Sequence, residues 1–171
     1  PPPSDYANMI REVTEGLGLQ VILEPGRVIA GNAGVMVTEA LYTKNAPKRT
    51  FLIVDAGMND LIRPALYQAH HDFLPVRERP EGAETMSYDV VGPICESTDK
   101  FAAERVMPVI EQGDRIAIMS AGAYGAALSS QYNARPLVAE VLVDGDQYAV
   151  VRRRPSFEDM ISLETTPDWL N

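Results

Sequence analysis

The stretch LVAEVLVDGDQYAVVR, residues 137–152, predicts a β-hairpin and sets the structural class of the larger part of the chain. Two strand-like runs, 137–143 and 147–152, flank Asp144-Gly145. An Asp-Gly pair between two such runs is among the strongest local signals for a tight hairpin turn. The stretch therefore favours antiparallel β-structure near the end of the sequence.

Short apolar segments upstream of the hairpin are also interpreted as strands, because turn signals separate them. They span residues 50–54, 73–76, 86–91 and 115–119. Six short strands of this kind indicate a mainly antiparallel β-barrel or sandwich. We therefore expect a β-domain over residues 46–171.

The first 45 residues have a different pattern. Ser4 is expected to cap an amphipathic helix, the apolar run Leu19–Leu23 to form a short buried strand, and residues 33–42 to form a second helix. Helix, strand, loop and helix in this order are typical of a parallel α/β unit. Because a lone parallel strand has no neighbour to pair with, we interpret residues 1–45 as the C-terminal piece of a (β/α)8 barrel that begins upstream.

Composition excludes several classes of function. The formal net charge of −9 argues against a nucleic-acid partner, which requires a basic surface. The single cysteine cannot form an internal disulfide, and the sequence contains neither a long apolar stretch nor a leader pattern. With 46% apolar residues, the chain can bury a core. We expect a cytoplasmic globular protein with no membrane partner.

Four short motifs place charged or reactive side chains next to glycine or proline. They are Glu24-Pro25-Gly26-Arg27, Arg63-Pro64-Ala65-Leu66-Tyr67, Cys95-Glu96 within residues 92–99, and Tyr124 within Gly122-Ala123-Tyr124-Gly125. Each motif alone has an ordinary structural explanation, such as a turn, a loop or a buried cysteine. Their order and spacing, taken together, make a functional interpretation specific.

The first motif follows a strand-like run and precedes a helical segment, which is where ligands bind at the edge of an α/β barrel. Gly26 permits a close approach, and free backbone N–H groups there suit a phosphate. A guanidinium matches the two oxygens of a carboxylate with two parallel N–H donors, which a lysine cannot do. Arg27 and Arg63 are therefore suited to bind an acidic group, although each of them, read alone, is more often a solvated residue.

In combination, the four motifs resemble those of the diaminopimelate decarboxylases, which are pyridoxal-phosphate-dependent enzymes of the alanine racemase fold type. The resemblance runs from about Leu19 through Arg154. It implies decarboxylation of a small amino acid, meso-diaminopimelate, to L-lysine. The implied ligands of the cofactor, pyridoxal 5'-phosphate, are Glu24, Pro25, Gly26, Arg27 and Tyr124. The implied substrate-binding residues are Arg27, Arg63, Tyr67, Glu96 and Tyr124.

The same resemblance makes Cys95 the catalytic proton donor. After carbon dioxide leaves, the substrate carbon must be reprotonated, and a nearby thiol can serve as that acid. In the family this cysteine enters the active site from the neighbouring subunit, and the following glutamate, here Glu96, holds the distal ammonium of the substrate. The resemblance therefore implies a homodimer with shared active sites.

A pyridoxal enzyme also needs a lysine that forms a Schiff base with the cofactor. The chain contains Lys44, Lys48 and Lys100, and none matches the family's lysine, which lies on an early barrel strand. We therefore expect the chain to be the C-terminal portion of the enzyme. Its partner would be the N-terminal barrel segment, without which it would be inactive.

Two alternatives stay open from the sequence. One is a related decarboxylase of ornithine, arginine or carboxynorspermidine, although those substrates need no second arginine and those relatives usually carry aspartate at the position of Glu96. The other is a non-catalytic module that lacks the lysine-bearing half. A metal site at His70-His71 is not expected, because adjacent histidines point to different sides of most backbones.

Overall fold

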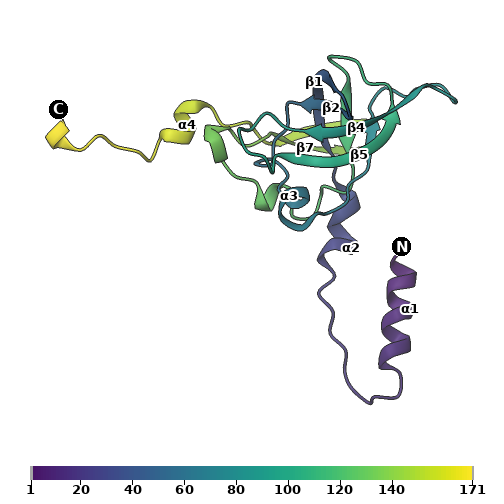
Figure 1. Ribbon diagram of the computed structural model, residues 1–171. Coiled ribbons are helices and arrows are strands. Elements are labelled where there is room, and N and C mark those ends of the chain that lie inside the picture. The colour runs from purple at the N-terminus through teal and green to yellow at the C-terminus, as the bar shows by residue number, and fades with distance from the viewer. Residues whose placement is uncertain (1, 171) are drawn as a thin grey trace.

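A six-stranded mixed sheet forms the body of the protein, as the computed structural model, which describes residues 2–170, makes clear (Figure 1). Its strand order is β3-β6-β1-β2-β4-β5. The strands are β1 (Met36–Ala46), β2 (Arg49–Val54), β3 (Phe73–Pro75), β4 (Thr85–Val91), β5 (Lys100–Pro108) and β6 (Arg115–Ile118). All pairs are antiparallel except β2 with β4. The predicted sheet domain is confirmed.

The core lies on one face of this sheet because apolar residues alternate along the strands. Leu52 and Val54 of β2 and Ile116 and Ile118 of β6 are completely buried. A period of two places alternate side chains on the same face of a strand. These strands were predictable for that reason, since their buried residues alternate with less apolar or more exposed ones.

Two strands of the sheet were missed by the sequence prediction. The helix expected over residues 33–42 is wrong, because most of this segment belongs to β1, which pairs with β2 on one side and β6 on the other. Thr38 and Ala40 are its buried positions, two residues apart. The other missed strand, β5, buries only Phe101 and Met107 and has charged residues between them.

The N-terminal segment forms fewer contacts than expected. The predicted first helix exists as α1 (Pro3–Thr14), but Ser4 lies inside it and makes no capping bond, since the cap position is Pro2. The buried strand expected at Leu19–Leu23 is wrong, because this run is irregular and exposed, with Ile22 80% accessible. A strand needs a neighbouring backbone, and none of the described residues pairs with this run.

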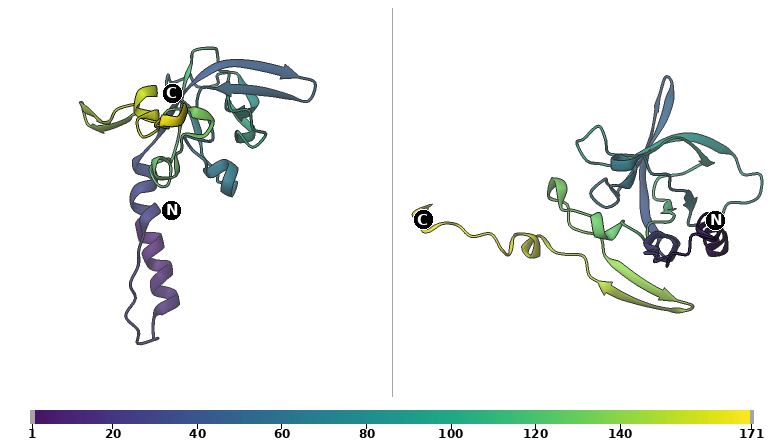
Figure 2. Two further views of the ribbon diagram at one scale, coloured as in Figure 1. Left: turned by 90° about the vertical axis from the view of Figure 1, so that its left-hand side faces the viewer. Right: turned by 90° about the horizontal axis from the view of Figure 1, so that it is seen from below.

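The predicted hairpin is confirmed as β7 (Glu140–Asp144) and β8 (Gln147–Arg152). Asp144 pairs with Gln147, so the turn is Gly145-Asp146, and Gly145 has the positive φ of 55° that such turns require. The first strand begins three residues later than expected. The hairpin lies apart from the six-stranded sheet (Figure 2) and exposes apolar side chains such as Tyr148.

Short helices complete the chain. They are α2 (Gly26–Ala30), α3 (Arg63–Tyr67), α4 (Phe157–Ile161) and the 3-10 turns η1 (Gly31–Ala33), η2 (Ala126–Leu128), η3 (Tyr132–Ala134) and η4 (Asp168–Leu170). Both ends of the chain extend away from the sheet body (Figure 1). Over residues 2–170, no helix combines the length and apolar character needed to cross a bilayer.

The surface area reflects this extended shape. The chain exposes 12,363 Å². A compact monomer of 18.8 kDa is expected to expose only about 8,300 Å². The excess area comes with exposed apolar side chains on the terminal segments and the hairpin, such as Leu19 and Leu142. Burying surfaces of this kind is what drives association between protein parts.

Candidate functional site

A cleft of about 990 Å³ brings three of the four sequence motifs together. Its walls come from the start of α1, from α2, from α3 and from the segments that follow α3 and β6. The predicted site residues that line it are Glu24, Pro25, Gly26, Arg27, Arg63 and Tyr124. Tyr67 is not among the residues that line the cleft, but its ring contacts Arg63, which is. Cys95 and Glu96 do not line the cleft.

Close backbone packing positions two of these motifs. The Ala121 N–H donates to the Gly34 carbonyl at 2.8 Å, and the Gly122 N–H donates to the Gly31 carbonyl at 3.1 Å. A Cβ on Gly34 would lie only 2.6 Å from the Cα of Gly122, so a side chain here would separate the two segments. Because α2 directly precedes one segment and Tyr124 directly follows the other, this contact forms the cleft.

Two aromatic rings hold the Arg63 guanidinium in the cleft. Its Cζ lies 5.8 Å from the ring centre of Tyr67 and 5.7 Å from that of Tyr124. Contacts of this kind are cation–π interactions, and they limit the rotamers of the long arginine side chain. Tyr124 has a positive φ of 62°, a strained conformation for a residue with a side chain. A Cβ on Gly26 would lie 3.6 Å from the Tyr124 hydroxyl, so α2 is adjacent.

The cleft also contains His70 and His71, whose role there the sequence did not reveal. His71 is buried, and its Nδ1 lies 2.9 Å from the Met119 carbonyl, so this nitrogen carries the proton and donates it. Burial lowers the pKa of His71, and the charges of Arg63 and Arg27 lower it further. The cleft is therefore locally positive in a chain of negative net charge, an environment that suits anionic ligands.

The only sequence signal that the histidines lie in the cleft was their position, which begins three residues after the arginine–tyrosine motif. A metal site at this pair was not expected from the sequence. Among residues 2–170 no group of three or more histidine, cysteine, aspartate or glutamate side chains is arranged to hold a metal ion.

The Cys95–Glu96 loop, residues 92–99, is exposed on the surface but fixed at its base. The buried Asp99 carboxylate accepts the Met58 N–H and the Ile94 N–H, both at 2.7 Å. Burial raises the pKa of Asp99, and these two hydrogen bonds oppose the increase. Cys95 and Glu96 are both exposed at the tip of the loop. The Thr98 N–H and the Ser97 hydroxyl lower the pKa of Glu96, which favours its charged form.

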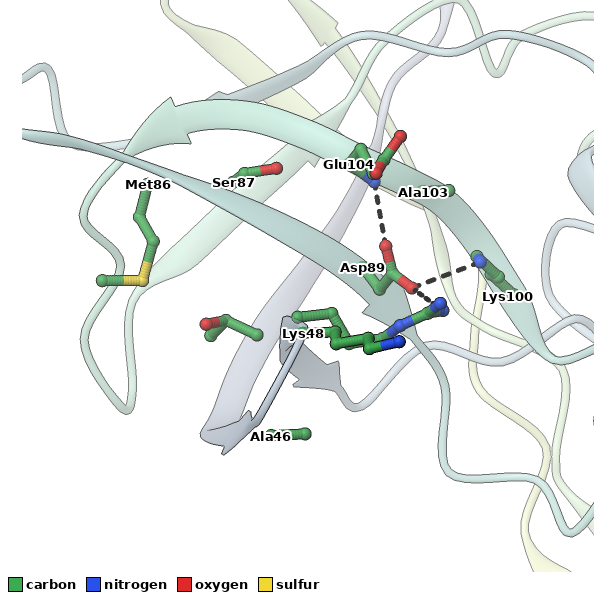
Figure 3. A pocket seen from close by; sticks show the side chains of 10 residues that line it. Ala46, Lys48, Met86, Ser87, Asp89, Lys100, Ala103 and Glu104 are labelled. Carbon is green, nitrogen blue, oxygen red and sulfur yellow. Dashed lines mark hydrogen bonds and ion pairs between the residues drawn. The ribbon is translucent and has the colours of Figure 1, made fainter.

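A second pocket, of about 630 Å³, lies between β2, β4 and β5 and contains none of the predicted site residues (Figure 3). Its centre is the buried carboxylate of Asp89, which accepts Arg49 Nη1 at 2.8 Å, Lys100 Nζ at 3.3 Å and the Glu104 N–H at 2.9 Å. Burial acts to raise the pKa of Asp89, but these donors outweigh it and lower the pKa. The Asp89 carboxylate is bound by Arg49, Lys100 and the Glu104 N–H, which is a structural role.

Comparison with known proteins identifies related sequences. Residues 13–122 match the model of a family described as the pyridoxal-dependent decarboxylase, C-terminal sheet domain. The diaminopimelate decarboxylase of Zymomonas mobilis is 46% identical over 99% of the chain, and that of Haemophilus influenzae is 48% identical over 97% of the chain. The chain spans about 40% of the length of these curated relatives.

A solved structure has the same arrangement of elements. The crystal structure of diaminopimelate decarboxylase from Helicobacter pylori complexed with L-lysine superposes with a TM-score of 0.80 at 44% identity. The match covers 94% of this chain and 39% of that one.

Proposed function

Because this chain belongs to the pyridoxal-dependent decarboxylases, whose C-terminal sheet domain it contains, we propose that it forms part of a diaminopimelate decarboxylase. The complete enzyme would remove a carboxylate from meso-diaminopimelate and release L-lysine. The observation that carries this proposal is the convergence of Arg27, Arg63 and Tyr124 on one positively charged cleft. The identities of 46% and 48% to curated enzymes of that name support the same substrate.

The donors of the cleft fit the phosphate of pyridoxal 5'-phosphate. Arg27 offers a guanidinium, Tyr124 offers a hydroxyl, and Gly26 has no side chain to obstruct an approach between them. Glu24 and Pro25 form the adjoining wall. When bound, this cofactor supplies an aromatic ring that accepts the electrons released as carbon dioxide departs.

We assign the substrate carboxylate that is retained in the product to Arg63, supported by Arg27 and Tyr67. The guanidinium fork makes two parallel hydrogen bonds to a carboxylate. Since the rings of Tyr67 and Tyr124 already restrict Arg63, little side-chain freedom is lost when the substrate binds. A fixed arginine would hold one end of the substrate so that only the other carboxylate reaches the reacting position.

Cys95 and Glu96 complete the proposed site in a second copy of the chain. Both are exposed and lie outside the cleft of their own chain, which supports a role across a homodimer interface. Cys95 would donate its thiol proton to the substrate carbon after decarboxylation. Glu96 would hold the distal ammonium, and the lowered pKa keeps its carboxylate charged at neutral pH. A thiol with this role requires a reducing compartment, so we also propose a cytoplasmic location.

The remaining part of the enzyme would be a (β/α)8 barrel that supplies the cofactor lysine. Residues 1–45 would belong with this barrel, where the exposed run Leu19–Leu23 would find neighbouring strands. The boundary at residue 45 stays a prediction, as β1 crosses it. The excess exposed area and the 40% length coverage of the relatives support a larger whole.

Turnover by the complete enzyme tests the proposal. Release of L-lysine and carbon dioxide from meso-diaminopimelate is expected, with no turnover of ornithine or arginine. Arg63→Gln should raise KM for meso-diaminopimelate about 10- to 150-fold, because it removes a charged hydrogen-bond pair worth about 1.5–3 kcal/mol. The exposed Arg77, replaced by glutamine, is the matched control and should change KM by less than about twofold. Turnover of ornithine in place of diaminopimelate would refute the assignment.

A further inference from the structure

The loop formed by residues 55–60 makes up most of the connection from β2 to α3. Its shape therefore sets the position of Arg63, the first residue of α3. Its first residue is fixed to β1, since Asp55 Oδ1 accepts the Thr38 hydroxyl at 2.6 Å and the Glu39 N–H at 2.8 Å. Its last residues, Asn59 and Asp60, are buried. Buried polar residues must find hydrogen-bond partners, so the partners of this loop decide its shape.

One arginine, Arg135, joins the two ends of this loop. Its Nη2 donates to the Asp55 carbonyl at 2.6 Å, and its Nε donates to Asn59 Oδ1 at 3.1 Å. The same Nη2 lies 3.8 Å from Asp60 Oδ2. Arg135 is 75 to 80 positions further along the sequence, so the contact is purely tertiary. A planar guanidinium can reach all three groups at once, whereas the single ammonium of lysine cannot.

Arg135 contributes bonds that the rest of the loop does not replace. Asn59 Nδ2 donates to Asp60 Oδ1 at 2.9 Å, and Asp60 Oδ2 accepts the Gly57 N–H at 2.9 Å. Without Arg135, the buried Asn59 would lose the donor to its Oδ1, and the Asp55 carbonyl would lose its donor as well. Such networks act as units, and removing one member displaces its neighbours.

We propose that Arg135 is a positioning residue for Arg63: it fixes the loop from which α3 starts and so places the Arg63 guanidinium for the substrate carboxylate. This inference rests on the substrate-binding role proposed for Arg63. Arg135 itself does not line the cleft, so it acts only through the loop.

Steady-state kinetics of the complete holoenzyme provide the first test. Arg135→Gln should lower kcat/KM for meso-diaminopimelate about 10- to 100-fold, mainly through KM, because a binding group misplaced by about 1 Å costs up to roughly 10²-fold. Arg152→Gln is the matched control, since its side chain is 34% exposed against 31% for Arg135 and is also ion-paired. The control should change KM by less than about twofold.

A double-mutant cycle separates positioning from general destabilisation. If Arg135 acts through Arg63, then Arg135→Gln should change KM by less than about twofold in an Arg63→Gln background. If the increase in KM of the double variant equals the product of the increases in the two single variants, the inference is overturned. That result would mean that Arg135→Gln acts independently of Arg63, as a general loss of folding does. Should Arg135→Gln fail to retain cofactor, Arg135→Lys enters the same cycle and should also raise KM, as it keeps the charge but not the fork.

Hydrogen exchange provides a readout that does not depend on turnover. The peptide covering residues 57–61 of the holoenzyme should exchange faster in Arg135→Gln than in the unmodified enzyme or in Arg152→Gln. Equal exchange in all three proteins would overturn the positioning role, even for an enzyme that decarboxylates diaminopimelate. Faster exchange in an enzyme with no activity on diaminopimelate would support positioning and refute the proposed substrate.

Discussion

A methyl group at Gly34 tests whether the contact between the segment after α2 and the Tyr124 loop builds the cleft. The added Cβ would lie 2.6 Å from the Cα of Gly122 and 3.0 Å from its nitrogen, well inside the usual contact distance. Gly34 has φ −132° and ψ 144°, which alanine adopts without strain. The effect of Gly34→Ala is therefore steric, and the backbone atoms that it meets cannot rotate away.

The size of the effect follows from the contacts that must open. Overpacking costs about 1–3 kcal/mol. Weakening the two backbone hydrogen bonds across this contact adds up to about 0.5–1.5 kcal/mol each. Replacing glycine returns about 0.4–1 kcal/mol, because the unfolded chain loses freedom. The net cost is about 1–5.5 kcal/mol. If the cofactor phosphate requires both walls of the cleft, its affinity should fall about tenfold or more, at 1.4 kcal/mol per factor of ten.

Titration of the complete apoenzyme with pyridoxal 5'-phosphate, followed by absorbance, measures this affinity. Ala33→Ser is the matched control, because Ala33 is exposed, directly precedes Gly34 and does not line the cleft. The control should bind the cofactor within about twofold of the unmodified enzyme. Equal affinity of the Gly34→Ala and Ala33→Ser enzymes would refute the idea that this contact forms the cofactor site.

Two further predictions concern single side chains. Cys95→Ala should slow turnover by on the order of 10²-fold with the cofactor absorbance retained; unchanged turnover would remove the thiol from the reaction. Since the pKa of His71 is lower in the folded protein than its ordinary value of 6.5, the unfolded chain binds this proton more readily, and the free energy of unfolding should decrease as pH falls through about 6.5. Urea unfolding at several pH values should show this slope in His70→Gln but not in His71→Gln.

The sequence predicted those strands in which buried apolar residues alternate with more exposed ones, or which a turn signal bounds. Leu52, Val54, Ile116 and Ile118 repeat with a period of two, and the hairpin carries its turn signal at Asp144-Gly145. In contrast, β1 has the apolar Val37 and Leu41 at positions that alternate with its buried Thr38 and Ala40, so its period was ambiguous. Local pattern identifies a strand less readily when apolar residues occupy both of its faces.

The sequence predicted which residue types form the candidate site, but not which distant residues hold them in position. The sequence identified Arg27, Arg63 and Tyr124 because the order and spacing of their motifs resemble those of a known family, and the structure brings all three to one cleft. It did not reveal Arg135, because this arginine acts through bonds to residues 55 and 59, which are 76 or more positions away. Long-range positioning of this kind leaves no local signal, since any exposed arginine has the same sequence context.

The shape of the Cys95–Glu96 loop bears on how a dimer could share its active sites. Asp99 holds the loop from within its own chain by accepting the Met58 and Ile94 N–H groups, so the loop needs no partner to become ordered. Association then costs little conformational entropy at this point, because the thiol is presented by a fixed backbone. A proton donor must be in place when the carbon loses its carboxylate. A mobile loop would not meet this requirement, because each substrate molecule would first have to order it. The buried carboxylate of Asp99 is therefore the feature that best reconciles the exposure of Cys95 with the catalytic role proposed for it.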